Sequence, residues 1–297
     1  MTNTIIFVIS TSELYFVREG EKEMETDEKY VVGKALGETE NFRLYQCSIP
    51  TGGVGILKIA ASVENNGVLD REAFILQTLR DEAVRLEEEY AKVKTDPKRL
   101  LNYQIMFPNL VDSFISEDEG GRRINVVNFN HVGDDIGRLV PISHLVSRDY
   151  IRVDPRTSAW ILGKLLKLLV FVHSQGMSTG QVTGENILIE RDKHYVAFFD
   201  WSKATIHGDN TPSEIACEEI SQVTKEVILA LGGNPNTGVL PADVQDKDGR
   251  YAAYLYGLAC GSESDASKAH EDFYEFIRTT LGWHGYHPFT TYNLERS

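Results

Sequence analysis

The feature of this 297-residue sequence that most constrains its fold is a change of pattern near its middle. Residues 30–129 hold several short runs of β-branched and aromatic residues, with a single long helical pattern among them. The residues after 128–133 follow mostly helical patterns. Strands followed by helices favour an α+β protein, so we predict two lobes, the first β-rich and the second mostly helical.

The first half contains one helical pattern and a set of strand-like runs. Apolar residues recur every three or four positions from Leu69 to Val93, which predicts an amphipathic helix. The strand-like runs of the lobe are 30–32, 42–47, 55–60, 110–115 and 124–129. Before them, the β-rich runs 5–9 and 14–17 predict a hairpin. We therefore expect three parts, listed as an N-terminal hairpin extension and linker (1–29), a first lobe (30–129) and a second lobe (130–297).

The second half carries clear signals for helix ends. Asp154 and Pro155 form a capping residue and a first-turn proline, and they predict a long buried helix that ends at Gly176. Short strands are expected at 187–189 and 195–199. The sequence 211–214, Thr-Pro-Ser-Glu, has the pattern of a capping box and predicts the start of another helix. The pattern of the last predicted helix extends from 265 to 281.

The composition excludes several partners and sites. The chain has 44 acidic and 30 basic residues, a net charge of −14, which disfavours nucleic acid and anionic membranes because both are polyanions. The three cysteines, Cys47, Cys217 and Cys260, are far apart and lack metal-site spacing. We expect reduced thiols in a cytoplasmic protein. The apolar run at residues 5–9 is too short for a signal peptide or a membrane span.

Two blocks of the second half resemble motifs of the protein-kinase-like superfamily. The string 179–188, Thr-Gly-Gln-Val-Thr-Gly-Glu-Asn-Ile-Leu, is similar to a kinase catalytic loop. The string 196–202, which contains Asp200-Trp201-Ser202, is similar to the strand end that carries the D-F-G metal motif. The resemblance extends from about residue 30 to the C-terminus. A closer likeness is to kinase-like proteins of bacteria and phages that have Asp-Trp in the metal motif and no acid in the catalytic loop.

The resemblance implies binding of ATP with Mg²⁺. Lys58 resembles the strand lysine that contacts the nucleotide phosphates, and Glu72 resembles its helix partner, because a buried lysine needs a carboxylate to remain charged. Asn186 and Asp200 match the two magnesium ligands, whose oxygens are of the kind that Mg²⁺ prefers. Gly37 lies where the phosphate loop is expected.

Gln181 is the first departure from the kinase pattern. It stands five residues before Asn186, where a kinase carries its catalytic aspartate, and an amide cannot accept a proton at neutral pH. The phosphate loop is the second departure, since Glu38 and Glu40 replace its later glycines and would repel phosphates.

The third departure is the short segment that follows Asp200. The next predicted helix begins after a loop of about ten residues, and no Ala-Pro-Glu motif appears to hold a peptide substrate. Either Glu218 or Glu219 is expected to replace the helix acid that usually ties down the catalytic loop.

Three functions are consistent with these patterns. The first is a nucleotide-binding pseudokinase that acts on a protein partner as a regulatory or interaction module. The second is an atypical ATP-dependent phosphotransferase, or a nucleotidyl transferase, that acts on a small molecule or a protein without a catalytic-loop aspartate. The third is a structural protein that binds nothing, which Glu38 and Glu40 favour.

Overall fold

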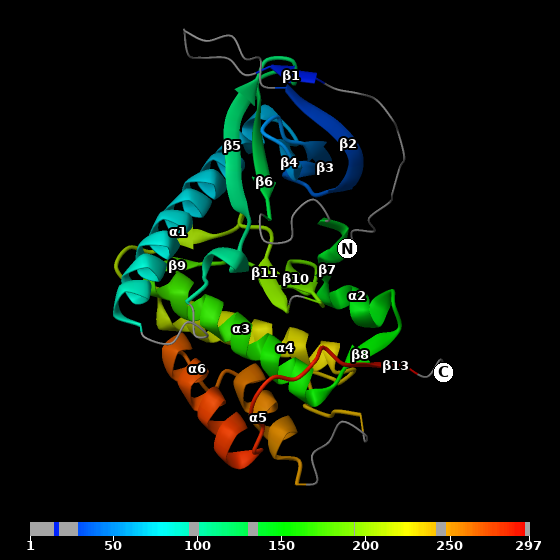
Figure 1. Ribbon diagram of the computed structural model, residues 1–297, viewed down its shortest axis with the longest axis vertical. Helices are drawn as coiled ribbons and strands as arrows, with labels where there is room; N and C mark the ends of the chain where they lie inside the picture. The colour runs from blue at the N-terminus through cyan, green and yellow to red at the C-terminus, as the bar shows by residue number, and fades with distance from the viewer. Residues whose placement is uncertain are drawn as a thin grey trace. The chain divides into compact units, whose positions relative to one another are not determined.

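The computed structural model describes residues 15–17, 29–94, 101–129, 136–192, 194–241 and 248–294. The chain divides into two compact units, Met1–Gly137 and Arg138–Ser297. The first unit carries a six-stranded sheet with one long helix, and the second is mostly helical (Figure 1). The α+β class expected from the sequence is therefore confirmed. The predicted boundary at 129/130 stays a prediction, because residues 130–135 lie outside the described ones.

The sheet of the first unit is antiparallel, in the strand order β1-β2-β3-β4-β6-β5. The strands are β1 (Tyr15–Val17), β2 (Lys29–Glu38), β3 (Phe42–Ser48), β4 (Val54–Ala60), β5 (Asn109–Ser116) and β6 (Arg122–Asn128). All five strands predicted for this lobe are present. Strand β1 pairs with β2, whereas its predicted hairpin partner, residues 5–9, lies outside the described residues.

Alternation along β4 sends its side chains to opposite faces of the sheet. Leu57 and Ile59 belong to a hydrophobic cluster on one face. Ala60 packs with Leu69 of helix α1 (Asn66–Val93) on the other face. Lys58 lies between Leu57 and Ile59 in sequence, so its side chain points to the face that α1 covers.

Helix α1 is the predicted amphipathic helix, and its buried stripe includes one charge. A short 3-10 turn, Val63–Asn65, precedes the helix. The buried residues of α1 are Leu69, Glu72, Ala73, Ile75, Leu76, Leu79 and Ala83. A carboxylate in an apolar stripe requires a partner on the facing sheet, because burial disfavours an unpaired charge. A further 3-10 turn of this unit is Gln104–Met106, and the 3-10 turn Ile136–Arg138 spans the division between the two units in the sequence.

The second unit is built around helix α3 (Pro155–Ser174), which packs against α4 and α6 (Figure 1). The other helices are α2 (Ile142–Ser147), α4 (Ser213–Ala230), α5 (Arg250–Ala259) and α6 (Ala266–Glu275), which a π-helical turn (Phe276–Thr280) continues. The short strands are β7 (Val140–Pro141), β8 (Ile151–Val153), β9 (Met177–Ser178), β10 (Ile187–Glu190), β11 (Tyr195–Phe198), β12 (Thr205–Ile206) and β13 (Thr291–Asn293).

Helix α3 begins and ends where the sequence predicts. The Asp154 side chain accepts a hydrogen bond from the Thr157 backbone at 2.8 Å, and Pro155 occupies the first turn. Gly176, at a φ of 63°, follows the helix in the left-handed conformation that a glycine adopts without strain. The helix is long and apolar enough to cross a membrane, but 67% of its apolar window is buried inside the structure, as expected of a core helix.

One prediction about a helix start is wrong, and two helices were not predicted. The capping box at 211–214 is wrong, because α4 has no side-chain cap and the Thr211 hydroxyl donates instead to the Met177 carbonyl at 2.7 Å. A hydroxyl that is turned toward a carbonyl of a neighbouring strand does not present its oxygen to the N–H groups in the first turn of its own helix. Helices α2 and α5 were not predicted, since a six-residue and a ten-residue helix give too few turns for a clear period.

Candidate functional site

The first unit brings together Lys58 of β4 and Glu72 of α1. The Lys58 Nζ donates to Glu72 Oε1 at 2.5 Å, and both side chains are 0% exposed. The Lys58 ammonium also lies 4.6 Å from the centre of the Phe42 ring, where an aromatic face attracts a cation. The pair is therefore enclosed between the sheet, the helix and an aromatic ring of the same unit.

Asn125 is a buried polar residue of this pair that sequence reasoning missed. It lies on β6 directly opposite Lys58 in the strand register. Its Nδ2 donates to Glu72 Oε2 at 3.2 Å, so both oxygens of the Glu72 carboxylate are held. An amide in a strand between apolar neighbours such as Ile124 and Val126 was the available signal.

The predicted phosphate loop is a tight turn. Gly37 lies within β2 opposite Leu44, next to an irregularity in the strand register. Residues 39–41 alone connect β2 to β3, and the Thr39 backbone closes the turn by donating to the Phe42 carbonyl at 2.8 Å. The side chains of Glu38 and Glu40 are exposed. No long glycine-rich loop is available here, because Glu38 ends β2 and Glu40 lies in the middle of the short turn.

In the second unit the β10–β11 hairpin brings Asn186 beside Asp200. Ile187 of β10 pairs with Phe198 of β11. Asn186, directly before Ile187, and Asp200, two residues after Phe198, therefore lie at the same end of the hairpin. The Asp200 backbone donates to Asn186 Oδ1 at 2.5 Å, and Asn186 Nδ2 donates to the Asp200 carbonyl at 2.9 Å. Asn186 thereby fixes the chain where the predicted metal carboxylate begins.

The donor set of this pair fits a magnesium ion that arrives with a phosphate ligand. Among the described residues, no group of three or more His, Cys, Asp or Glu side chains could hold a metal by itself. Asp200 is only partly buried, and it offers a carboxylate beside the Asn186 amide oxygen. Mg²⁺ takes few protein oxygens and completes its shell with water and substrate phosphates.

Gln181 lies on the exposed side of the loop that leads to Asn186. Its backbone carbonyl accepts from Asn186 Nδ2 at 3.3 Å, and its side chain is exposed. Gly180 before it has a φ of 78°, and a Cβ on Gly180 would lie 1.8 Å from the Lys203 carbonyl oxygen. The position before Gln181 therefore accepts only glycine, both for its backbone conformation and for the approach of the neighbouring chain.

Helix α4 holds this loop through Glu219, which is 3% exposed. Its Oε1 accepts from the Thr179 hydroxyl at 2.5 Å and from the Gly180 backbone at 2.8 Å. Its Oε2 lies 2.8 Å from His173 Nε2. Glu218, the other candidate for this acid, is exposed and accepts from the Gln222 side chain of its own helix at 3.0 Å. Of the two acids left open by the sequence, Glu219 ties down the loop.

Two further residues of α4, Gln222 and Glu226, also accept hydrogen bonds from the backbone of this loop. The Val182 backbone donates to Gln222 Oε1 at 3.3 Å. Burial raises the pKa of the Glu226 carboxyl and the nearby Glu185 charge adds to this, although a hydrogen bond from the Gly184 backbone opposes the shift. The backbone N–H groups at 180, 182 and 184 of the loop thus meet acceptors on one face of α4.

The short segment after Asp200 is paired to the same loop. Strand β12 pairs with β9, with Thr205 opposite Ser178. The His207 backbone donates to the Gly176 carbonyl at 2.7 Å, and a Cβ on Gly176 would lie 1.7 Å from the Gly208 carbonyl oxygen. Backbone contacts at Gly176 and Gly180 therefore hold the segment after Asp200 against the loop along its length.

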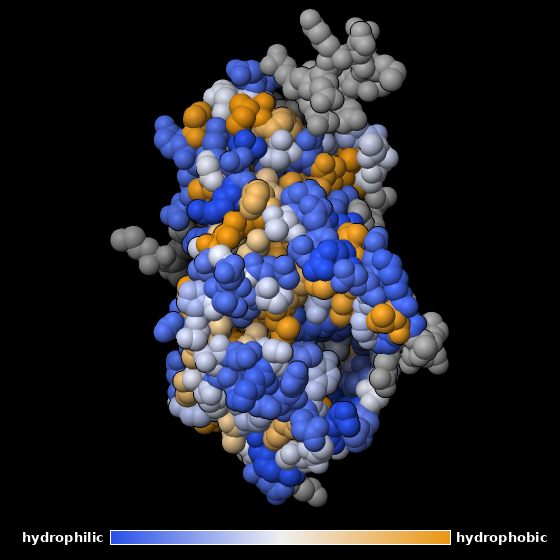
Figure 2. Space-filling view, turned by 90° about the vertical axis from the view of Figure 1, so that its left-hand side faces the viewer, coloured by the Kyte–Doolittle hydropathy of each residue, from blue (hydrophilic) through white to orange (hydrophobic). Residues whose placement is uncertain are grey.

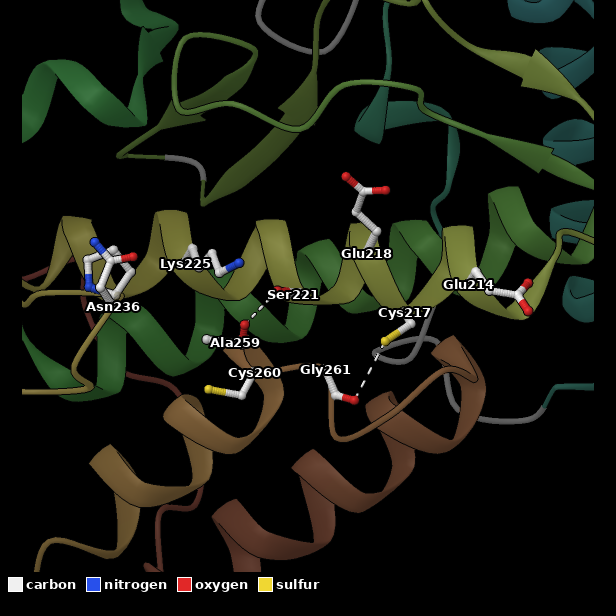
Figure 3. A pocket seen from close by; sticks show the side chains of 10 residues that line it. Glu214, Cys217, Glu218, Ser221, Lys225, Asn236, Ala259, Cys260 and Gly261 are labelled. Atoms are coloured by element: carbon white, nitrogen blue, oxygen red, sulfur yellow. Dashed lines mark hydrogen bonds between the residues drawn. The ribbon is translucent and has the colours of Figure 1, made fainter.

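A hollow of about 470 Å³ lies elsewhere on this unit, between α4 and the end of α5 (Figure 3). Glu218 lines it, but none of Gly37, Lys58, Glu72, Gln181, Asn186 and Asp200 does. Cys217 and Cys260 are both in its wall, but the Cys217 thiol points to the Gly261 carbonyl, at 3.6 Å, and the Cys260 thiol points away from it. The hollow therefore contributes nothing to the site formed by Asn186 and Asp200.

The fold has counterparts among solved structures, although no family model and no curated protein matches the sequence. A double mutant of the PknI kinase domain from Mycobacterium tuberculosis superposes with a TM-score of 0.50 and 13% identity, over 83% of this chain and 95% of that chain. A second double mutant and a single mutant each give a TM-score of 0.49, at 14% and 13% identity, over 83% of this chain and 94% of theirs. The chain has the two-lobed protein-kinase-like fold that the sequence predicts. At this identity the likeness concerns the fold alone.

The anchoring role of Glu219 predicts a large difference between neighbouring substitutions. Glu219→Ala leaves the buried Thr179 hydroxyl and the Gly180 N–H without their acceptor, so it should lower the free energy of unfolding by about 2 kcal/mol or more. Glu218→Ala, at the adjacent exposed position, should change it by less than about 0.5 kcal/mol. Urea denaturation measures both, and equal losses would contradict the anchoring role.

The raised pKa of Glu226 predicts a pH-dependent effect of its neutral analogue. Because the folded state disfavours the ionised form, stability from this group is present at low pH and is lost as the pH rises through the folded pKa. Glu226→Gln should therefore match the parent protein below pH 4.5, the ordinary value, and be more stable at neutral pH. Thermal unfolding from pH 4 to 8, with the exposed Glu271→Gln as the control, tests this. A stability difference that does not vary with pH would contradict it.

Proposed function

We propose that the protein is a nucleotide-binding pseudokinase, which binds ATP with Mg²⁺ and acts on a protein partner as a regulatory or interaction module. The observation that carries this proposal is the fully buried pair of Lys58 and Glu72. Burying two charges costs several kcal/mol per ion, and an apolar pair of similar volume would serve a purely structural protein as well or better. A buried lysine is useful when its ammonium binds the phosphate groups of a ligand, and such binding would account for the charged pair.

The second unit supports the metal part of the proposal. Asn186 and Asp200 would hold the magnesium ion, and the ion would offset the negative charge of the nucleotide phosphates. The Asn186 amide also fixes the backbone at Asp200, so the carboxylate is positioned before any ligand binds.

The missing base supports regulation instead of transfer to a peptide. Gln181 cannot take a proton from a hydroxyl at neutral pH, and the segment after Asp200 is paired to the loop along its length. The protein partner remains to be identified. On the face drawn in Figure 2, hydrophobic residues lie in small groups among hydrophilic ones, so the described part of that face offers no broad apolar docking surface. The net charge of −14 disfavours nucleic acid and anionic membranes as partners.

Nucleotide binding should be visible as thermal stabilisation that depends on Asp200. ATP at 100 times its dissociation constant stabilises the folded state by about 2.7 kcal/mol, and Mg²⁺ should increase the shift in Tm. Asp200→Asn keeps the acceptor for the Ser202 backbone but removes the charge, so it should abolish the Mg²⁺ dependence. Asp209→Asn, at an exposed position of the same segment, should behave as the parent protein does. A parent Tm that does not respond to ATP with Mg²⁺ would refute nucleotide binding.

An atypical phosphotransferase or nucleotidyl transferase is the second candidate. It is favoured by the way Glu219 holds the loop that carries Gln181, because phosphoryl transfer depends mainly on positioning and charge stabilisation. A loop that only had to fill space would not need a buried carboxylate with three partners.

Separate labelling of the ATP phosphates distinguishes the two candidates. A phosphotransferase moves the label from the γ-phosphate, a nucleotidyl transferase moves it from the α-phosphate, and a pseudokinase moves neither. Incubation with small hydroxyl compounds and with the protein itself should leave both labels on the nucleotide if the first proposal holds. Gln181→Asp restores a carboxylate at the position of the base, and a gain of γ-phosphate transfer of about 100-fold would indicate descent from an enzyme.

A further inference from the structure

The Lys58–Glu72 pair is the end of a longer polar chain inside the first unit. Asn125 Nδ2 donates to Glu72 Oε2 at 3.2 Å and to the Leu69 carbonyl of α1 at 2.8 Å. Asn125 Oδ1 accepts from the Ser113 hydroxyl of β5 at 2.8 Å. Asn125 is 0% exposed, and its one amide therefore joins two strands to both the backbone and the functional carboxylate of the helix.

The register of the sheet explains why these groups meet. Lys58 is opposite Asn125, and Asn125 is opposite Ser113, on the adjacent strands β4, β6 and β5. Residues opposite each other in antiparallel strands project to the same face. The three side chains therefore form a polar row across the face that α1 covers.

The polar row reaches the surface at a second contact with α1. Arg123 Nη1 donates to the Ser113 hydroxyl oxygen at 2.9 Å, and Arg123 Nη2 lies 2.9 Å from Asp70 Oδ1. At the helix start, Asn66 accepts from the Arg123 backbone at 2.7 Å and donates to the Gly121 carbonyl at 2.9 Å. The first two turns of α1 are thus bonded to the β5–β6 hairpin at four successive places.

We propose that Asn125 is a positioning residue that holds α1 and Glu72 in place, so that the Lys58–Glu72 pair stays formed whether or not a nucleotide is bound. A helix whose first turns are bonded to the sheet through side chains and backbone cannot shift without breaking buried hydrogen bonds. Lys58 is then aimed by the resting protein and α1 does not act as a switch. This inference rests on the proposed function for the statement that the positioned Lys58 serves a nucleotide. The position of α1 and Glu72 can be measured without a nucleotide.

Amide hydrogen exchange of the full chain tests the proposal. In the parent protein without nucleotide, the amides of residues 69–79 should be protected, and ATP with Mg²⁺ should change their exchange by less than about twofold. Asn125→Leu has a similar volume and removes the three hydrogen bonds of the amide. It should accelerate exchange in residues 69–79 about tenfold, while β3 and β4 keep their protection.

A matched pair of serine substitutions on β5 provides the control. Ser113→Ala removes the group that orients Asn125, whereas Ser116→Ala removes a buried hydroxyl that accepts from the Glu119 backbone in the adjoining turn at 3.3 Å. Ser113→Ala should accelerate exchange in residues 69–79 by about threefold and Ser116→Ala by less than about twofold. If Asn125→Leu yields no folded protein, the comparison of Ser113→Ala with Ser116→Ala tests the proposal instead. Equal effects of these two variants on the exchange of residues 69–79 would overturn the proposal.

A spectroscopic signal separates positioning from general stability. In protein labelled with ¹⁵N-lysine, an ammonium held in a buried pair exchanges its protons slowly and gives a visible signal. The Lys58 signal, assigned with Lys58→Arg, should be present in the nucleotide-free parent and in Ser116→Ala, and should weaken at least threefold in Asn125→Leu, by about the factor that loss of one hydrogen bond gives. A signal that appears only after ATP and Mg²⁺ are added would overturn the inference. Failure of ATP to bind would refute the proposed function and leave this test unaffected.

Discussion

A buried ion pair determines how the first unit has to be built. An ammonium and a carboxylate that are both 0% exposed must meet each other and must have every remaining lone pair and proton satisfied. The strand register meets this demand by setting Asn125 next to Lys58, and the helical period meets it by setting Glu72 in an otherwise apolar stripe. The helix is consequently held at one axial position on the sheet.

In the second unit, polar side chains of a helix hold a loop in place. Its loop from Thr179 to Asn186 is irregular and partly buried, so its backbone N–H groups need acceptors. Helix α4 supplies them from Glu219, Gln222 and Glu226, which recur at the spacing of one helix face. In both units a buried carboxylate on a helix fixes the element that would contact a ligand, which suits a protein whose site is ordered in advance.

The sequence predicted the class of fold, the long helices and the residues that approach one another within each unit. Lys58, Glu72, Asn186 and Asp200 were accessible because the strings around them resemble kinase motifs, and the apolar stripe of the helix also placed Glu72 on its inner face. Asn125 and Ser113 were not accessible, since their roles depend on strand register, which no local pattern specifies. The capping prediction at Thr211 failed for a similar reason, because its hydroxyl bonds to a strand distant in sequence.

The close backbone contacts at Gly176 and Gly180 have a consequence for recognising related chains. A segment that touches a loop at two points without room for a β-carbon cannot gain or lose residues between those points and keep both contacts. The length from Lys203 to Gly208 is therefore more restricted than the identity of the side chains within it. Distant relatives should share the two glycines and that interval even where the residue at 181 has changed, so spacing is a better guide to kinship than the loop motif.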